Sequence, residues 1–188
     1  MRVRDRRRGE GEVIFTMNPS SKPPLKVLVL CTGNSARSIL GEYLLRQIGR
    51  GRFETFSAGS HPTGRVNPLA VRVLREKYNL DASAARSKSA DEFRGVKLDV
   101  VITVCDHAKE ACPVWPGVPV LAHWGSPDPA AVEGTETEKY WAFVQVASQI
   151  ARRAELFCAL PEAKLLDGPA VRAIGEQAKL ENEAEMKK

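Results

Sequence analysis

The sequence predicts an α/β protein with three layers, in which helices cover both faces of a central four-stranded parallel sheet. Two observations favour this fold class. Four short apolar runs alternate along the chain with longer stretches of helical periodicity. The first run is apolar after its first residue, as a strand buried on both faces should be. The chain has 188 residues, 43% of them hydrophobic, which suffices for one domain with a substantial core.

The strands are expected at residues 26–30, 53–58, 98–104 and 119–122. The third run carries the strongest strand signal because β-branched residues dominate it. In a parallel sheet covered by helices, active sites lie beyond the carboxyl ends of the strands. Cys31 directly follows the first predicted strand and Cys105 directly follows the third. Both thiols are therefore expected at the same edge of the sheet.

The helices are expected at residues 38–48, 69–78 and 137–160, with at most a short helical turn at 91–93. Pro68 stands where the second helix should begin, and Gly49 follows the first helix. The long helix carries a continuous apolar stripe from Tyr140 to Phe157, which we interpret as a core-facing surface.

The two ends of the chain differ in composition from its middle. Residues 1–24 are expected to be a disordered basic extension and linker, residues 25–160 a folded domain, and residues 161–188 a helical tail. Arginines near the start supply much of the net charge of +5, and we interpret them as a solvated arm, so no nucleic acid partner is expected. The charged, weakly amphipathic end of the tail favours a frayed helix in solvent.

Hydropathy and cysteine usage indicate a cytoplasmic protein. No run of eighteen apolar residues predicts a membrane span, and no apolar segment follows the basic start as in a secretory signal. The chain is therefore expected in the cytoplasm without a membrane partner. Four cysteines in that compartment indicate reactive thiols rather than a disulfide framework.

A short loop between the first strand and the first helix is the strongest functional signal. It begins at Cys31 and ends at Arg37, with Ser38 directly after it; the residues between are Thr32, Gly33, Asn34, Ser35 and Ala36. Backbone N–H groups of such a loop, together with a helix N-terminus, would bind an oxyanion that the guanidinium also contacts. The same field stabilises a thiolate, so Cys31 is the candidate nucleophile. The alternative is a buried cysteine beside a surface arginine.

Cys105 and Cys112 form a second candidate constellation. A metal site lacks ligands, because the chain has only three, widely spread histidines and no closely spaced cysteine pair, so no metal is expected. A redox relay fits better. If residues 106–112 were helical, the two Cα atoms would lie about 10.5 Å apart, beyond the roughly 7 Å limit for a disulfide. The pair would then bond only if this segment changed shape; the alternative is one buried and one surface thiol.

Asp128 stands between two prolines in a loop after the fourth predicted strand. A loop of this kind presents a carboxylate at a fixed place. If it folds over the Cys31 loop, Asp128 can protonate a leaving oxygen as a general acid. The alternative is an aspartate that only caps its own turn.

The loop from Cys31 to Ser38, placed after the first strand, resembles the signature loop of low-molecular-weight tyrosine phosphatases. Together with Cys105, Cys112-Pro113 and His123-Trp124-Gly125 ahead of Asp128-Pro129, it resembles the arsenate reductases built on that fold. The resemblance covers roughly residues 26–160 and implies the low-molecular-weight phosphatase-like fold. It also implies reduction of arsenate to arsenite, for arsenic detoxification, through a relay of Cys31, Cys105 and Cys112.

The resemblance further implies the site residues and partners. Cys31, Arg37, Cys105, Cys112 and Asp128 would be catalytic, and the backbone from Thr32 to Ser38 would bind the oxyanion. Arsenate would be the substrate with phosphate as competitor, and thioredoxin, or glutathione with glutaredoxin, would supply electrons. No cofactor is expected. The alternative function is a phosphatase acting on phosphotyrosine or small phosphoesters.

One position departs from the resemblance. Some members of the family bind potassium with an Asn, a Glu, a Ser and an acidic residue, and Asn34, Glu42 and Ser57 match the first three. Lys88 stands near the acidic position. Our hypothesis is that the Lys88 ammonium substitutes for the cation.

Overall fold

The computed structural model describes residues 22–105, 117 and 120–176. Its centre is a sheet of four parallel strands in the order β2-β1-β3-β4. The strands are β1 (Leu25–Cys31), β2 (Phe53–Gly59), β3 (Val100–Thr103) and β4 (Val120–His123). The parallel four-stranded sheet predicted from the sequence is therefore confirmed, although β3 is shorter than the predicted strand. No helix among these residues is long and apolar enough to cross a membrane.

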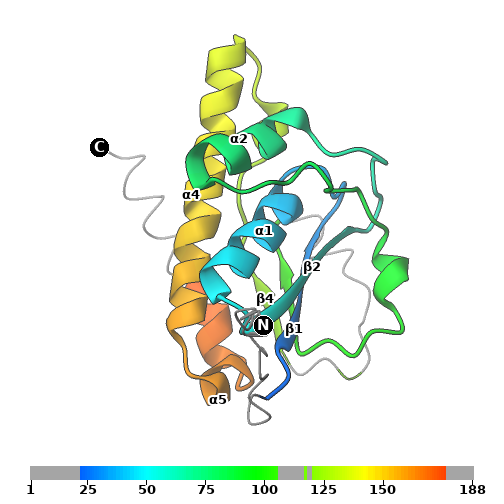
Figure 1. Cartoon of the computed structure of the whole chain (residues 1–188), viewed down its shortest axis with the longest axis vertical. Coiled ribbons are helices and arrows are strands. Elements are labelled where there is room, and N and C mark those ends of the chain that lie inside the picture. The colour runs from blue at the N-terminus through cyan, green and yellow to red at the C-terminus, as the bar shows by residue number, and fades with distance from the viewer. Residues whose placement is uncertain (1–21, 106–116, 118–119, 177–188) are drawn as a thin grey trace, which may run out of the picture.

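Helices flank this sheet, as predicted. The α-helices are α1 (Arg37–Gly49), α2 (Pro68–Tyr78), α4 (Glu136–Ala159) and α5 (Glu162–Leu165), and the short 3-10 helices are η1 (Ala90–Phe93) and η2 (Pro129–Ala131). Figure 1 shows α1 and α4 side by side, with α2 against the upper part of α4. A capping box starts α4, in which Thr135 and Glu138 bond each other's backbone N–H groups.

The two faces of the sheet have separate cores, because successive side chains of a strand point in opposite directions. Val27 and Val29 of β1 join the cluster that contains Phe157 of α4. Leu28 and Leu30 join the cluster on the other face, with Phe93 of η1. The strand interior is almost inaccessible to solvent, which explains why the first apolar run predicts a strand so clearly.

The direction of the strand connections reverses at β1. This strand has β2 on one side and β3 on the other, so the chain crosses over in opposite directions from it. Crevices outside the carboxyl ends of strands at such a reversal are where α/β proteins bind ligands. Cys31 is the last residue of β1 and lies at this point.

The end of the described chain differs from the prediction. The segment after α5 is helical at residues 169–176, but it is not a frayed helix in solvent. Val171 is fully buried and Ile174 is 5% exposed, and with Leu165 they belong to the core cluster of β1 and α4. The prediction was wrong here because three apolar side chains in a charged stretch suffice when they meet a preformed core.

Candidate active site

The loop between β1 and α1 has the geometry of an anion-binding site. Cys31 ends the strand and is 4% exposed, and Arg37 begins the helix. Among the described residues, no side chain caps the start of α1, where Ala36 has a non-helical backbone. The first N–H groups of a helix have no partner within it, and they carry positive potential. The strand, loop and helix predicted around Cys31 are thus confirmed, and the loop can receive an oxyanion.

Hydrogen-bond donors surround the Cys31 sulfur. The Asn34 backbone N–H donates to Sγ over 3.1 Å, and the Ser38 Oγ lies 2.9 Å from it. Asn34 Nδ2 donates to the same Ser38 Oγ over 2.8 Å. When Cys31 is a thiolate it has no proton to give, so the Ser38 hydroxyl then donates to the sulfur. Two donors on one sulfur stabilise negative charge there, which suits a nucleophile.

Asn34 holds the loop in a conformation that most residues avoid. Its φ is 44°, in the left-handed region that asparagine tolerates better than other residues with a side chain. Its side chain is fully buried, and its Oδ1 accepts from the Lys88 backbone N–H over 2.6 Å. The residues around Lys88 therefore fix the side chain that in turn fixes Ser38.

Lys88 also forms a buried ion pair beneath the loop. Its Nζ lies 2.9 Å from Glu42 Oε2, with side-chain exposures of 12% and 8%. Ser57 Oγ donates to the same oxygen over 2.5 Å, and Arg46 contacts Glu42 Oε1 over 2.6 Å. The ammonium thus contacts Glu42 on the oxygen that Ser57 also bonds, while the Lys88 backbone N–H bonds Asn34. A cation at this position agrees with the expectation that Lys88 substitutes for potassium.

We expect Lys88→Ala to lower the free energy of unfolding by about 2 kcal/mol, because buried Glu42 loses the charged partner Lys88 and keeps only Arg46. Potassium chloride should restore part of this stability to the variant and leave the wild type unchanged, relative to tetramethylammonium chloride at equal ionic strength. Urea unfolding curves measure both effects. Replacement of exposed Lys97 by alanine is the matched control. Specific stabilisation of the wild type by potassium would contradict the hypothesis.

Cys105 lies beside the Cys31 loop. It is 2% exposed, and its Sγ is 3.4 Å from Thr32 Oγ1. Leu30 pairs with Thr103 across neighbouring strands, so the chain delivers both thiols to one edge of the sheet, as predicted. Both are free thiols. Cys112 and the predicted spacing over residues 106–112 lie outside the described residues.

Asp128 contacts the arginine of the Cys31 loop. Its Oδ2 lies 3.0 Å from Arg37 Nη2, and Arg37 Nη1 donates to the Ser126 carbonyl over 3.1 Å. The loop that carries Asp128 therefore reaches the loop from Cys31 to Arg37, which we also call the oxyanion loop, as the general-acid interpretation requires. Asp128 Oδ1 also accepts from the Ala130 N–H over 3.1 Å, so the carboxylate caps its own turn as well. The two interpretations of this residue are compatible.

Two sets of contacts beside Arg37 were not predicted from the sequence: those of the Ser126 carbonyl and those of Arg153. Ser126 acts through its backbone carbonyl, for which a sequence carries no signal. Arg153 of α4 is fully buried and donates to the backbone of residues 124 and 125 and to Ser126 Oγ. A signal for Arg153 does exist, because a charged residue interrupts the apolar stripe between Ile150 and Phe157.

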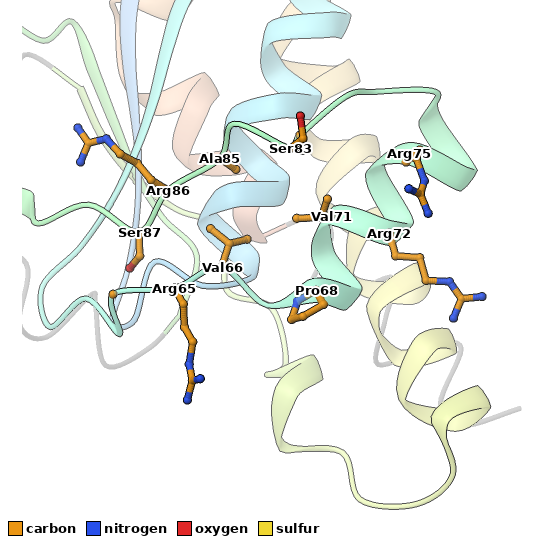
Figure 2. A pocket seen from close by; sticks show the side chains of 12 residues that line it. Arg65, Val66, Pro68, Val71, Arg72, Arg75, Ser83, Ala85, Arg86 and Ser87 are labelled. Atoms are coloured by element: carbon orange, nitrogen blue, oxygen red, sulfur yellow. The ribbon is translucent and has the colours of Figure 1, made fainter.

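An arginine-lined groove adjoins the oxyanion loop (Figure 2). Its volume is about 650 Å³, and its arginines are Arg65, Arg72, Arg75 and Arg86. In Figure 2 these arginines lie at the edge of the groove, and the apolar side chains of Val66 and Val71 lie between them. Ser87, on the wall of the groove, donates to the Gly33 carbonyl over 3.2 Å. Arg72 pairs with Glu76 and Arg86 with Glu92, so the positive potential of the groove beside the Cys31 loop comes mainly from Arg65 and Arg75.

The fourth thiol is expected to be inert. Burial raises the pKa of Cys158, near the end of α4, to about 11. Nearly all of this thiol is protonated at pH 7, so iodoacetamide should label it about 100-fold more slowly than an ordinary thiol. The labelling rate should rise with pH until the pH reaches about 11. Mass spectrometry of labelled peptides over time measures this rate. Labelling of Cys158 at pH 7 as fast as that of glutathione would contradict the prediction.

The chain is similar in sequence and fold to known proteins. Residues 26–164 match the family described as low molecular weight phosphotyrosine protein phosphatase. An arsenate reductase of Halalkalibacterium halodurans is 37% identical over 131 residues, covering 70% of this chain and 93% of the relative. A solved arsenate reductase in the phosphate binding state superposes with a TM-score of 0.59 and 26% identity, over 72% of this chain and 97% of that one. The thioredoxin-dependent arsenate reductase of Corynebacterium glutamicum gives 0.51 and 27%, over 72% and 64%.

Proposed function

This chain belongs to the low molecular weight phosphotyrosine protein phosphatase family, and we propose that within it the protein reduces arsenate to arsenite. The observation that supports this most is the second buried thiol: Cys105 lies next to Thr32 of the oxyanion loop, at the edge of the sheet where Cys31 ends β1. Hydrolysis of a phosphoester needs only one nucleophilic cysteine, whereas reduction of an oxyanion by thiols needs two electrons and therefore two sulfur atoms.

Arsenate binds first in the loop from Cys31 to Arg37. Backbone N–H groups and the start of α1 contact its oxygens, and Arg37 turns from Asp128 and Ser126 toward the anion. The Cys31 thiolate attacks arsenic while Asp128 supplies a proton to the departing oxygen, which leaves as water. Arsenic is then bonded to the Cys31 sulfur and is still pentavalent.

Cys105 completes the reduction. Its thiolate attacks the Cys31 sulfur, and the bond from that sulfur to arsenic breaks with its electron pair on arsenic. Arsenic becomes trivalent and leaves as arsenite, while the two thiols are oxidised to a Cys31–Cys105 disulfide. The proximity of Cys105 to the Cys31 loop supports this step, because exchange requires the attacking sulfur to reach the other one.

Cys112 returns the nucleophile to its reduced form. Its thiolate attacks Cys105, which frees Cys31 and leaves a Cys105–Cys112 disulfide for an external thiol protein to reduce. We propose thioredoxin as this protein, because a structural neighbour is a thioredoxin-dependent arsenate reductase. Glutathione with glutaredoxin is the alternative donor, and phosphate should compete with arsenate for the loop.

The test is arsenite release compared with phosphoester hydrolysis by the same preparation. Purified protein with thioredoxin, thioredoxin reductase and NADPH should oxidise one NADPH for each arsenite released, and para-nitrophenyl phosphate should be hydrolysed slowly. The phosphatase alternative predicts rapid ester hydrolysis and no arsenite. Replacing thioredoxin with glutathione and glutaredoxin in the same assay identifies the donor.

A further inference from the structure

Residues 123–128, which are the last residue of β4 and the loop before η2, present two groups to Arg37; we call them the 123–128 loop. It presents the Ser126 carbonyl to Arg37 Nη1 at 3.1 Å and the Asp128 carboxylate to Arg37 Nη2 at 3.0 Å. The resting position of the Arg37 guanidinium therefore depends on where this loop lies. Contacts that hold this loop in place therefore also set the positions of the Arg37 guanidinium and the Asp128 carboxylate before the anion binds.

One support of the loop is Arg153 of α4. Its Nη1 donates to Ser126 Oγ over 2.8 Å and to the Trp124 carbonyl over 3.4 Å, and its Nη2 donates to the Gly125 carbonyl over 3.0 Å. The residue is fully buried, and no carboxylate pairs with it in the part of the chain that the structure describes. Removing a guanidinium from water without a counter-ion costs free energy. Among the described residues, the hydrogen bonds that offset this cost all go to this loop.

The other support is the segment after α5. The Trp124 indole N–H donates to the Val171 carbonyl over 3.4 Å, and Trp124 is only 1% exposed. Gly175 lies so close to the loop that a Cβ on it would come within 1.9 Å of the His123 carbonyl oxygen. Val171 and Ile174 anchor the segment in the core of β1 and α4.

This segment lies beyond the part of the chain that matches the family model. The match to the low molecular weight phosphatase family ends at residue 164, just before Leu165, whereas the packing continues through Ile174. The segment closes on the backbone of His123 and on the indole of Trp124, five and four residues before Asp128.

We propose that Arg153 and residues 165–176 form a brace that positions the 123–128 loop, and through it sets how strongly Arg37 binds an oxyanion. Arg153 and Gly175 are positioning residues in this account, since neither contacts Arg37 or Asp128 in the described structure. The inference rests on the proposed function only in taking the Cys31 loop as an oxyanion site. It holds whether the oxyanion is subsequently reduced or hydrolysed.

Two variants test the brace without touching the groups that contact the anion. Arg153→Lys keeps the charge but loses the fork that reaches three acceptors. Gly175→Ala places a methyl group against the His123 carbonyl and pushes the segment from the loop. The matched controls are Arg152→Lys, one position along the same helix with an exposed side chain, and Gly95→Ala, where a Cβ meets nothing within 4 Å.

The readout is the dissociation constant of inorganic phosphate, measured by protection of Cys31 from iodoacetamide in folded protein. Both brace variants should weaken phosphate binding about tenfold or more, because small displacements of a positioned group are costly, and both controls should leave it unchanged. Combining either variant with Arg37→Lys should add little further loss, because both changes act through Arg37.

A lower melting temperature with an unchanged phosphate dissociation constant would overturn the proposal, since it would show a purely structural role. Fully additive losses with Arg37→Lys would overturn it too. If Gly175→Ala does not fold, Ser126→Ala removes one of the three Arg153 bonds while keeping the carbonyl that faces Arg37, and it should weaken phosphate binding in the same direction. Since phosphate binding needs no electron donor, failure of arsenate reduction does not affect this test.

Discussion

A Cys31→Ser variant should lose arsenate reduction by about 10⁴-fold or more, the scale seen when a covalent nucleophile is removed. The structure gives the reason. The Cys31 sulfur is the atom on which the Asn34 N–H and the Ser38 hydroxyl converge, at the start of the loop that Arg37 closes. A serine hydroxyl stays protonated in the same place and cannot accept attack by a second thiol. Arsenite release under multiple-turnover conditions measures the loss.

Two further measurements make this result specific. Phosphate should still bind the Cys31→Ser variant, as isothermal titration calorimetry would show, because the backbone N–H groups and Arg37 remain. Cys158→Ser is the matched control and should keep full activity, since that thiol lies in α4 and its pKa is raised by burial. Residual steady turnover by Cys31→Ser would show that another residue is the nucleophile.

Gly59→Ala should lower kcat/KM by about 100-fold, because misplacing reacting groups by about 1 Å has effects of that size. Gly59 ends β2 and pairs in register with Cys31. A Cβ there would lie 2.6 Å from the Thr32 carbonyl oxygen and 3.0 Å from the Asn34 backbone nitrogen. That nitrogen is the donor to the Cys31 sulfur, so the added methyl group distorts the oxyanion loop itself.

The same substitution should also lower the free energy of unfolding by about 1–3 kcal/mol, the usual result of overpacking a core. Gly95→Ala is the control, because nothing lies within 4 Å of a Cβ at that position. Urea unfolding together with steady-state kinetics separates the two effects. Wild-type kcat/KM in Gly59→Ala would show that the loop tolerates displacement, against the proposed role of its geometry.

The sequence predicts the sheet and the nucleophilic loop well because both depend on local signals. Residues 26–30 carry the apolar pattern of a strand buried on two faces, and the alternation with helices leaves a parallel sheet as the simplest topology. That topology alone places Cys31 and Cys105 at one edge, which the strand register confirms. The contact of Lys88 with Glu42 could be anticipated only through the family resemblance.

Contacts that depend on tertiary packing could not be predicted in the same way. Arg153 interrupts an apolar stripe, but the sequence does not show that its partners are the loop at residues 124–126. The segment that carries Val171 and Ile174 has a composition typical of a solvated helix, and its burial depends on packing against Trp124 and the core, which no local pattern reveals. Sequence therefore identifies the reacting groups more readily than the groups that position them.

The proposed function depends on a relay of three thiols, which is tested by counting the arsenite molecules that each chain of a Cys112→Ser variant releases. We expect about one arsenite per chain, then arrest with a Cys31–Cys105 disulfide detectable by mass spectrometry, while the wild type with thioredoxin, its reductase and NADPH turns over many times. Steady multiple turnover by Cys112→Ser would contradict the relay, as would a wild type that hydrolyses para-nitrophenyl phosphate rapidly and releases no arsenite.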